Sequence, residues 1–398
     1  MSQAEIKPDV FYVGVNDRTT DLFEGLWPIA QEGVSYNSYL IDDEKKAVID
    51  LTKSIKVDDY FAKIDSVTDV SKIDYVIINH MEPDHSGLIR TLRIIAPQAT
   101  LVGSAKTKDM LEKFYSITDN VMVVNDGDIL KLGKRTLKFF ATPFLHWPET
   151  MMTFDTSDGI LFSCDAFGSY GAIRGALFDD DCKSREFYLK EALRYYVNIL
   201  ANFSPRVLAT IEKLKDLPID IIAPSHGLIW RKNISVIVDL YKKWAEYGLG
   251  GTEPGVTLLY GSMYGNTEIV MNAVAEGIAA EGVPLDIFDV SRTHVSYILP
   301  SLWTKRGVMI GAPTYEVSLF PTMAEVLNMA AHKHIKHKKA AYFGSYGWSG
   351  GALKGVKKIV DPLNWEVVDS FEFTGGATKD DIETAKDFGQ RFARLIKD

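Results

Sequence analysis

The sequence predicts an α/β protein of two domains, and three observations support this prediction. At 398 residues the chain is too long for one ordinary domain and long enough for two. Glycine and proline residues gather between Gly248 and Gly255, as they do in linkers. After this break, strand-like and helical segments alternate regularly, which is typical of a parallel, doubly wound sheet. We therefore expect one domain at residues 1–250 and a second at residues 251–398.

Composition narrows the classes of function. Hydrophobic residues make up 46% of the chain and charged residues 24%, as in a soluble globular protein. The net charge of −9 argues against nucleic-acid binding, which needs a basic face. The two cysteines, Cys164 and Cys182, can form neither a disulfide framework nor a four-thiolate iron site. Because we find neither a signal peptide nor a run of ~18 apolar residues, we expect a cytoplasmic protein that does not enter a membrane.

Short strand-like segments separated by turns fill the first half of the chain. The strands expected there are residues 9–13, 36–41, 47–50, 74–79, 100–103, 121–124, 135–141, 150–154, 159–163 and 219–223. The helices expected there are residues 60–64, 87–95, 106–115 and 184–203. In the second half we expect strands at residues 256–260, 285–290, 307–310, 340–343 and 366–368, and helices at residues 267–282 and 379–396.

Four potential metal ligands lie in one short run directly after the strand expected at residues 74–79. The run reads His80-Met81-Glu82-Pro83-Asp84-His85-Ser86, and we expect Pro83 to end the strand and hold the turn open. Imidazole plus carboxylate is a ligand set suited to iron, manganese or zinc. The alternative is a polar loop tip with solvated charges, which the other histidines of this half disfavour.

Those other histidines also follow expected strands. His146 lies in Phe144-Leu145-His146-Trp147-Pro148, and His226 lies in Pro224-Ser225-His226-Gly227. Asp165 follows the apolar strand that ends near Cys164. A single histidine at a strand end is usually a cap or a surface residue, but every histidine before the linker has this setting, and ligands at neighbouring strand ends can form a metal site on a rigid sheet. The predicted metal ligands and catalytic residues are His80, Glu82, Asp84, His85, His146, Asp165 and His226.

A turn rich in Ser, Gly, Asn and Thr follows the first strand of the second half. It reads Gly261-Ser262-Met263-Tyr264-Gly265-Asn266-Thr267 and leads into an expected helix. Backbone N–H groups, hydroxyls and the helix dipole favour a phosphate at such a turn. The turn lacks the lysine of a nucleoside-triphosphate loop and the G-x-G-x-x-G of a dinucleotide site, so neither ligand is expected.

Two more loops lie at carboxyl ends of expected strands, where ligands bind in open α/β sheets. Their aromatic residues Tyr315, Tyr346 and Trp348 suit the flanks of a flavin ring. The alternative for each loop is a glycine-rich turn with a core aromatic residue. The predicted cofactor-binding residues are Ser262, Met263, Tyr264, Gly265, Asn266, Thr267, Pro313, Thr314, Tyr315, Glu316, Ser345, Tyr346, Gly347, Trp348, Ser349 and Gly350.

The pattern H-x-E-x-D-H, followed by His146, Asp165 and His226, resembles the metallo-β-lactamase fold superfamily, whose usual motif is H-x-H-x-D-H. Glu82 stands where the hydrolases carry histidine, and an anionic ligand there favours iron over zinc. In this respect the chain looks like the flavodiiron proteins. The turn at residues 261–267 is similar to the phosphate loop of flavodoxins, which hold FMN. The resemblance covers essentially the whole chain and implies a metallo-β-lactamase-like αββα sandwich followed by a flavodoxin-like doubly wound parallel sheet.

The resemblance also implies ligand roles and an activity. His80, Glu82 and His146 would bind one iron, Asp84, His85 and His226 the other, and Asp165 would bridge them. FMN would relay electrons from an external donor to this non-haem diiron site, which would reduce nitric oxide to nitrous oxide and/or dioxygen to water. The expected assembly is a head-to-tail homodimer or a dimer of dimers, with Trp147 and Trp348 as candidate contact residues. Because no rubredoxin extension follows Asp398, we expect a separate rubredoxin-type protein or a reduced deazaflavin as the donor.

Other interpretations remain open at this point. A hydrolase of the same sandwich fold with an accessory flavodoxin-like domain would need no flavin and would prefer histidine at position 82. A pure electron carrier would leave the metal ligands unexplained. Tyr195 or Tyr196 is a candidate hydrogen-bond or proton donor to the metal site, with core packing as the alternative. The segment His332–Lys339 is expected to be solvated and to suit an acidic partner.

Overall fold

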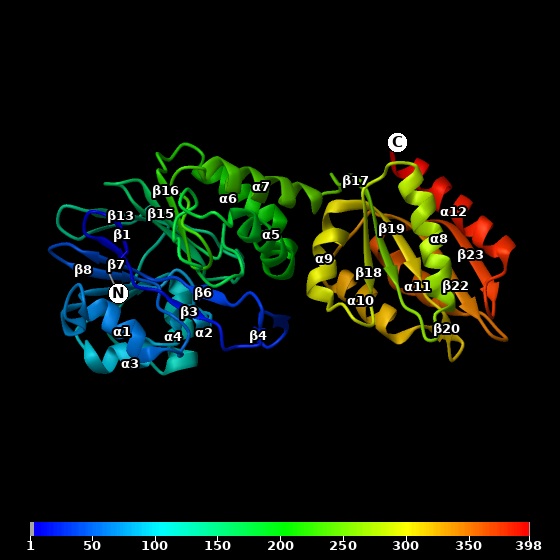
Figure 1. The fold of residues 1–398 in the computed structure, drawn as a ribbon. Helices are drawn as coiled ribbons and strands as arrows, with labels where there is room; N and C mark the ends of the chain where they lie inside the picture. Colours follow the sequence, from blue (N-terminus) through cyan, green and yellow to red (C-terminus); the bar gives the residue numbers. More distant parts are fainter. Residues whose placement is uncertain (1–3, 398) are drawn as a thin grey trace. The chain divides into compact units, whose positions relative to one another are not determined.

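The computed structural model describes residues 4–397. The chain forms two compact units, one ending at Lys243 and one beginning at Trp244 (Figure 1). The division falls inside helix α7 (Ile234–Tyr247) rather than in the glycine-rich segment that follows it. The last turn of α7 belongs to the second unit because its groups bond there: the carbonyl of Trp244 accepts a 2.8 Å hydrogen bond from Trp303, and the Tyr247 hydroxyl donates to Glu253.

The first unit contains two stacked sheets. The larger sheet has the order β1-β2-β7-β8-β9-β10-β11 and the smaller one the order β12-β13-β14-β15-β16. The strands are β1 (Ala4–Lys7), β2 (Val10–Tyr12), β7 (Tyr39–Asp42), β8 (Lys46–Ile49), β9 (Tyr75–Ile77), β10 (Thr100–Gly103), β11 (Val121–Val123), β12 (Ile129–Lys131), β13 (Thr136–Ala141), β14 (Met151–Asp155), β15 (Ile160–Cys164) and β16 (Ile221–Pro224). One apolar core joins them, because Ile49 and Ile77 of the larger sheet pack with Phe139 and Phe162 of the smaller one.

Helices cover the outer faces of both sheets (Figure 1). They are α1 (Val57–Asp65), α2 (Pro83–Ser86), α3 (Ile89–Ile95), α4 (Ala105–Tyr115), α5 (Arg185–Tyr195), α6 (Ser204–Leu214) and α7. In Figure 1, α1, α3 and α4 lie beside the larger sheet, and α5 to α7 lie toward β15 and β16. This arrangement is the predicted αββα sandwich. Among the described residues, no helix combines the length and the apolar character needed to span a bilayer.

Strand directions bring several loops to one rim of the sandwich. Strands β13 and β15 are both antiparallel to β14, so they run in the same direction, and β16 is parallel to β15. The loops after β13, β15 and β16 therefore lie at the same edge of the smaller sheet. The end of β9 reaches this edge as well, since the Asn79 carbonyl accepts a 3.0 Å hydrogen bond from the Met151 N–H at the start of β14.

Some elements differ from the sequence predictions for the first unit. The expected strand 36–41 is two strands: β6 (Val34–Tyr36) pairs with β3 (Val15–Asp17), and β7 joins the larger sheet. The interruption falls at Asn37, whose buried side chain donates to the carbonyls of Pro224 and Gly227. Several further elements were not predicted from the sequence: β1, β12, α6, α7 and the hairpin of β4 (Leu22–Phe23) and β5 (Trp27–Pro28).

The expectation that Pro83 holds an open turn was wrong. Pro83 is the first residue of the helical turn α2. Proline favours this position because its missing N–H would have no intrahelical partner there and its fixed φ suits a helix. The turn is closed by hydrogen bonds from the N–H groups of His85 and Ser86 to the carbonyl of Glu82. Asp84 and His85 therefore occupy a helical turn rather than a loop.

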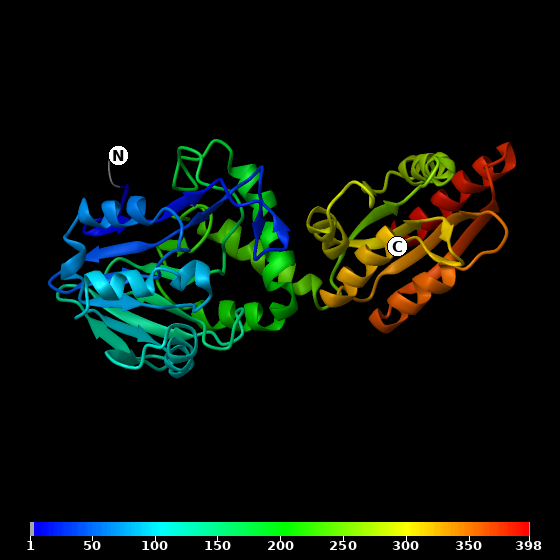
Figure 2. The ribbon, with the colours of Figure 1, turned by 90° about the horizontal axis from the view of Figure 1, so that it is seen from below.

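The second unit is a five-stranded parallel sheet with helices on both faces. Its order is β18-β17-β19-β22-β23, and every neighbouring pair is parallel. Its main elements are β17 (Glu253–Tyr260), α8 (Asn266–Ala280), β18 (Leu285–Asp289), α9 (Val295–Thr304), β19 (Lys305–Gly311), α10 (Pro321–His332), β22 (Lys339–Tyr346), α11 (Ala352–Val360), β23 (Glu366–Thr374) and α12 (Lys379–Lys397). In Figure 2, α8 and the red α12 lie on one side of the sheet and the orange α11 on the other. The predicted doubly wound sheet is thus confirmed.

Two predictions for this unit need correction. Helices α9, α10 and α11 were not predicted from the sequence; in α9 the helical pattern is interrupted by Pro300, which lies inside the helix. The segment His332–Lys339 is not solvated throughout. Lys338 is buried, and its ammonium donates to the carbonyls of Trp303 and Lys305 at 3.1 and 2.7 Å. Only the remaining charged residues of this segment are available to solvent.

Helices α8 and α12 approach each other closely at two glycines. A Cβ on Gly277 would lie 2.1 Å from the carbonyl oxygen of Lys386, and a Cβ on Gly389 would lie 2.2 Å from that of Val274. Both neighbours are backbone atoms, which cannot move aside as a flexible side chain can. Glycine at these positions therefore permits the two helices to pack against each other over the sheet.

We predict that Gly277→Ala destabilises the second unit. Overpacking of this kind costs about 1–3 kcal/mol, and against a backbone oxygen it outweighs the roughly 1 kcal/mol that alanine gains in a helix. Calorimetry of the full chain should show a lower midpoint for the second unit and an unchanged midpoint for the first. Gly251→Ala is the control, because its Cβ would meet only atoms at ordinary contact distance. Equal midpoints for Gly277→Ala and the wild type would contradict the prediction.

Candidate metal centre and cofactor loops

All seven predicted metal ligands meet at the rim of the sandwich. His80 follows β9, Glu82 precedes α2, and α2 itself carries Asp84 and His85. The loops after β13, β15 and β16 supply His146, Asp165 and His226. The four imidazoles are buried, and His146, the most accessible of them, is 8% exposed. Strand ends of both sheets thus place imidazoles and carboxylates at one point.

One half of the cluster consists of His80, Glu82 and His146. The Nε2 atoms of both histidines lie 3.2 Å from Oε2 of Glu82. The same two nitrogens face Oδ2 of Asp165, at 3.5 Å from His80 and 3.3 Å from His146. We call these three residues, with this oxygen of Asp165, the first ligand group.

The other half consists of Asp84, His85 and His226. Oxygens of Asp84 lie 3.5 Å from Nε2 of His85 and 3.3 Å from Nε2 of His226. Both nitrogens also face Oδ1 of Asp165, at 3.1 and 3.3 Å. These residues form the second ligand group. Asp165 therefore points one carboxylate oxygen at each group, which is the arrangement of a bridging ligand.

Hydrogen bonds on the far side of the rings fix which nitrogen faces the cluster. Nδ1 of His226 lies 2.8 Å from the carbonyl oxygen of Ser35, which can only accept, so this nitrogen carries a proton. Nδ1 of His80 lies 2.6 Å from Oε1 of Glu149, an oxygen that also accepts from the backbone N–H of Met81. In both rings Nε2 is the atom directed at the carboxylates, as in a metal ligand.

Several buried atoms at the centre of the cluster lack hydrogen bonds. Those without a partner among the described residues include both carboxylate oxygens of Asp84, Oδ2 of Asp165 and Nε2 of His226. Buried polar atoms without partners are costly, so such groups are normally paired or coordinate a metal. Cations between the imidazoles and the carboxylates would satisfy all of them. The residues therefore fit a two-metal site with mixed nitrogen and oxygen ligands.

The electrostatics of the cluster agree with this interpretation. Burial lowers the pKa of His146, but its contacts with Asp165 and Glu82 outweigh burial and raise the pKa to about 10. The pKa of His226 is raised to about 9, because Asp165 and Asp84 likewise outweigh burial. Burial raises the pKa of Asp165, but the imidazoles around it hold that pKa well below its usual range. A metal ion that binds here therefore replaces protons on the imidazoles.

Aromatic residues surround the cluster. Of the two tyrosines that the sequence offers as hydrogen-bond donors to the site, only one reaches it. The hydroxyl of Tyr195 donates to Oδ1 of Asp165 at 2.9 Å, so this residue is at the site. Tyr196 is not, because its hydroxyl bonds with Ser204 at 2.8 Å. A π-helical segment, Tyr196–Leu200, begins directly after Tyr195, and such segments are frequent at functional sites. The half-buried Trp147 packs edge-on against His80, with ring centroids 5.1 Å apart.

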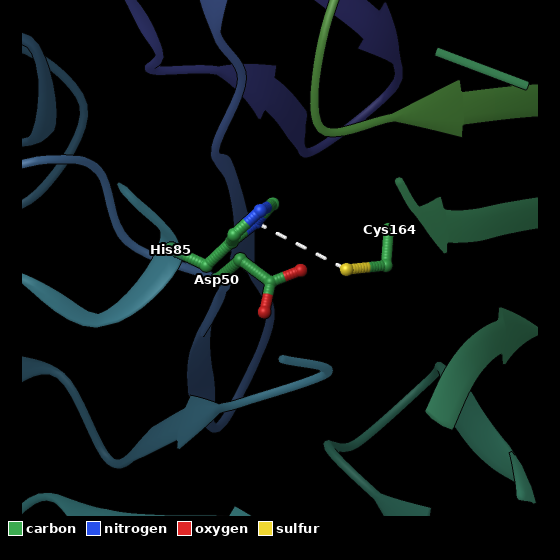
Figure 3. A group of neighbouring side chains, drawn as sticks. All are labelled: Asp50, His85 and Cys164. Atoms are coloured by element: carbon green, nitrogen blue, oxygen red, sulfur yellow. Dashed lines mark hydrogen bonds between the residues drawn. The ribbon is translucent and has the colours of Figure 1, made fainter. Parts of the chain in front are cut away.

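Three residues around the ligands were not predicted from the sequence. Glu149 bonds with His80, and the carboxylate of Glu24 lies near Glu82 and His146. Cys164 lies behind His85, with its sulfur 4.0 Å from Nδ1 of that ring (Figure 3). In the sequence, only proximity to a predicted ligand could have indicated two of these residues: Glu149 is in the same loop as His146, and Cys164 directly precedes Asp165.

A small cavity opens beside the cluster. Its volume is about 270 Å³, and its lining includes Glu82, Asp84, Phe23 and Tyr36. Pockets for drug-sized ligands measure about 300–1,000 Å³. The cavity thus suits a small substrate, and it meets both ligand groups, since Glu82 belongs to the first and Asp84 to the second.

In the second unit, the three predicted cofactor loops lie side by side. They follow the adjacent strands β17, β19 and β22, whose ends are level because Tyr260 pairs with Gly311 and Gly311 with Phe343. The hydroxyls of Thr267 and Ser345 lie 3.3 Å apart and connect the first loop to the third. The sheet therefore gathers these segments at its carboxyl edge, where ligands bind in this fold.

The first of these loops has the local geometry of an anion-binding turn. Its glycine, Gly265, has a φ of 91°, which side chains rarely adopt, and its N–H donates to Ser262 at 3.0 Å. Helix α8 begins at the next residue, so its free N–H groups point into the turn. These features suit a phosphate.

Large aromatic residues of the loops are exposed. Tyr264 is 91% exposed, Trp348 87% and Tyr315 40%, while Tyr346 is half-buried. The alternative of a core aromatic residue is therefore wrong for Tyr315 and Trp348. Exposed aromatic rings beside a phosphate-binding turn are suited to contact a planar cofactor.

Comparisons with known proteins agree with both halves of this description. A family model described as ODP family beta lactamase matches residues 34–227, and a flavodoxin model matches residues 258–389. An anaerobic nitric oxide reductase flavorubredoxin of Salmonella arizonae is 35% identical over 98% of this chain and 81% of its own length. An uncharacterized protein of Methanocaldococcus jannaschii is 34% identical over 98% of both chains.

Solved structures give the same result. The flavodiiron protein from Giardia intestinalis matches with a TM-score of 0.93 and 29% identity, over 100% of this chain and 97% of that one. Rubredoxin oxygen:oxidoreductase from Desulfovibrio gigas also matches with a TM-score of 0.93 and 29% identity, over 100% and 99% of the two chains.

Fold and site together define a two-domain oxidoreductase that joins a metallo-β-lactamase-like domain to a flavodoxin domain. The chain belongs to the flavodiiron protein family. Its cofactors are accordingly FMN and a non-haem diiron centre.

We predict that removing the metal destabilises the first unit alone, because every residue of the two ligand groups lies in it. A ligand present at 100 times its dissociation constant stabilises the folded state by about 2.7 kcal/mol, which corresponds to about 5–10 °C for a unit of this size. Calorimetry with and without a chelator should show this fall in the first midpoint and no change in the second. An unchanged first midpoint would contradict a metal site in the cluster.

Proposed function

We propose that this protein reduces nitric oxide to nitrous oxide, dioxygen to water, or both, at a diiron centre held by the two ligand groups. His80, Glu82 and His146 bind one iron, Asp84, His85 and His226 bind the other, and Asp165 bridges them. The observation that carries the proposal is Glu82: its carboxylate lies 3.2 Å from Nε2 of both His80 and His146. An anionic ligand at this position favours iron, whereas the hydrolases of this fold have histidine there.

The relatives support both substrates. One is named an anaerobic nitric oxide reductase flavorubredoxin and another a rubredoxin oxygen:oxidoreductase. The cavity of about 270 Å³ beside the ligands has room for a diatomic gas. The hydrolase alternative is therefore not favoured, and the ligand cluster leaves no support for a pure electron carrier.

The protein's own residues organise the site for this reaction. When bound, FMN and iron would pass electrons from the external donor to the gas. Asp165 directs one oxygen to each ligand group, and the 2.9 Å hydrogen bond from Tyr195 holds the orientation of this shared carboxylate. The cavity beside the ligands has both aromatic walls, from Phe23 and Tyr36, and a positive charge, from Lys53. Fixed ligands on strand ends thus hold substrate positions close together, which lowers the entropy cost of the reaction.

FMN occupies the carboxyl edge of the second unit in this proposal. The turn Ser262–Thr267 holds the phosphate, and loops 313–316 and 345–350 hold the ring system. We further propose a rubredoxin-type protein or a reduced deazaflavin as the electron donor, and a head-to-tail homodimer or a dimer of dimers as the assembly. The name of the Desulfovibrio gigas relative supports a rubredoxin-type donor.

Anaerobic and aerobic turnover assays test the proposal. The purified protein should show a flavin spectrum and contain two irons per chain. With the same chemically reduced rubredoxin as donor, it should consume nitric oxide without oxygen present, or dioxygen, or both, and the ratio of rates gives the preferred substrate. Protein that contains zinc without iron, or no flavin, would contradict the proposal.

We predict that Glu82→His shifts the site toward zinc and abolishes gas reduction. The change replaces an anionic ligand by a neutral one, which lowers the preference for iron. Metal analysis should show zinc in place of iron, and turnover should fall by at least about 100-fold, as expected for loss of a metal ligand. Glu112→His, on the exposed surface of α4, is the matched control and should retain iron and activity. Full activity of Glu82→His with iron bound would refute the assignment.

A further inference from the structure

The residues behind the imidazoles differ between the two ligand groups. A metal-bound histidine usually donates its second ring N–H to another residue, and the charge of that acceptor tunes the basicity of the ligand. In the first group the acceptor behind His80 is a carboxylate, whereas in the second group the neighbours of His226 and His85 are a backbone carbonyl and a thiol. The two metal positions are therefore chemically unequal even though each has two histidines and one carboxylate of its own.

Behind the first ligand group, Glu149 makes hydrogen bonds with the ring of His80 and the backbone of Met81. Its side chain is fully buried, and Oε1 lies 2.6 Å from Nδ1 of His80 and 2.9 Å from the N–H of Met81. Since the Met81 N–H can only donate, Oε1 is an acceptor, and the proton of the shorter bond lies on His80. The other oxygen, Oε2, is buried with no hydrogen-bond partner among the described residues. The carboxylate thus directs its charge at His80 and at no other side chain of the cluster.

Behind the second group, the contacts are weaker. Nδ1 of His226 donates to the neutral carbonyl of Ser35. Nδ1 of His85 faces the sulfur of Cys164 at 4.0 Å, the outer limit for a bond to sulfur (Figure 3). Asp50 lies beside this pair in Figure 3, but its two oxygens accept from the backbone N–H and side-chain amide of Asn79 at 2.7 and 3.0 Å. No carboxylate in the described chain is therefore bonded to a histidine from behind in this group.

We propose that Glu149 is a positioning residue that makes the His80–Glu82–His146 position the tighter of the two metal positions, so that it fills first. A hydrogen bond to a carboxylate increases the electron density that His80 offers to the metal and fixes the ring against rotation. The second position has no such partner and fills at higher metal concentration. This inference rests on the ligand assignment proposed above and adds an order of loading to it.

Partial loading of the wild-type protein tests the order directly. The full-length protein with FMN bound is stripped of metal by a chelator, given one equivalent of Co²⁺ without oxygen, and crystallised. Anomalous scattering should place the cobalt between His80, Glu82 and His146. Cobalt divided equally between the two positions, or bound mainly by Asp84, His85 and His226, would overturn the inference. Cobalt bound at neither position would contradict the proposed metal centre itself, so the two failures are distinguishable.

A variant then tests the role of Glu149. Glu149→Gln keeps an acceptor oxygen of the same size but removes the charge. In an anaerobic titration with Co²⁺, followed by its visible absorption, the tighter step should weaken by about 10- to 100-fold while the weaker step stays unchanged. Cys164→Ser, which alters the group behind His85 instead, is the matched control and should leave the tighter step unchanged.

The titration also separates positioning from a purely structural role. If Glu149 only supported the fold, Glu149→Gln would weaken both steps together or neither, and either result overturns the inference. If Glu149→Gln does not fold, the cobalt position in the wild-type crystal still decides the order of loading, and Glu149→Asp replaces it in the titration. Because Glu149→Asp keeps the charge on a shorter side chain, it should weaken the tighter step less than Glu149→Asn does.

Discussion

The shared carboxylate of Asp165 is the constraint on which the first unit depends. One of its oxygens faces His80 and His146 and the other faces His85 and His226, so all four imidazoles lie within 3.5 Å of a single buried side chain. Such a concentration of buried polar groups is stable only with compensating charge. The αββα sandwich provides the required rigidity, because the groups lie at the ends of strands whose positions are fixed by the ladders and by the common apolar core.

Much of this arrangement could be predicted from the sequence, and the reason is local. Four ligands lie within the six positions 80–85 after one apolar strand, and the other three each follow a strand, so residue type and position within an element identify them. The second unit was also predictable, because a parallel sheet buries its strands on both faces and gives them continuous apolar runs. The glycine at 265 and the hydroxyls around it indicated a phosphate turn for the same local reason.

What the sequence did not indicate depends on contacts between distant segments. Glu149 is a loop carboxylate like many others until the fold places it 2.6 Å from a ring 69 positions earlier in the chain. Tyr195 and Tyr196 are neighbours in one helical segment, and only packing shows that the first reaches Asp165 and the second Ser204. The burial of Lys338 inside a basic run was missed likewise, because its partners are the carbonyls of Trp303 in α9 and Lys305 in β19, more than 30 positions earlier in the chain.

The distribution of the ligands along the chain has a consequence for biosynthesis. His80 to His85 follow the larger sheet, whereas His146, Asp165 and His226 follow the smaller one, so each ligand group draws on both sheets. During translation the first group has all its residues once Asp165 has left the ribosome, whereas the second group also needs His226 and the pairing of β16 with β15. The second metal position can therefore form only after β16 has completed the smaller sheet, whereas the residues of the first position are already available before that strand is added.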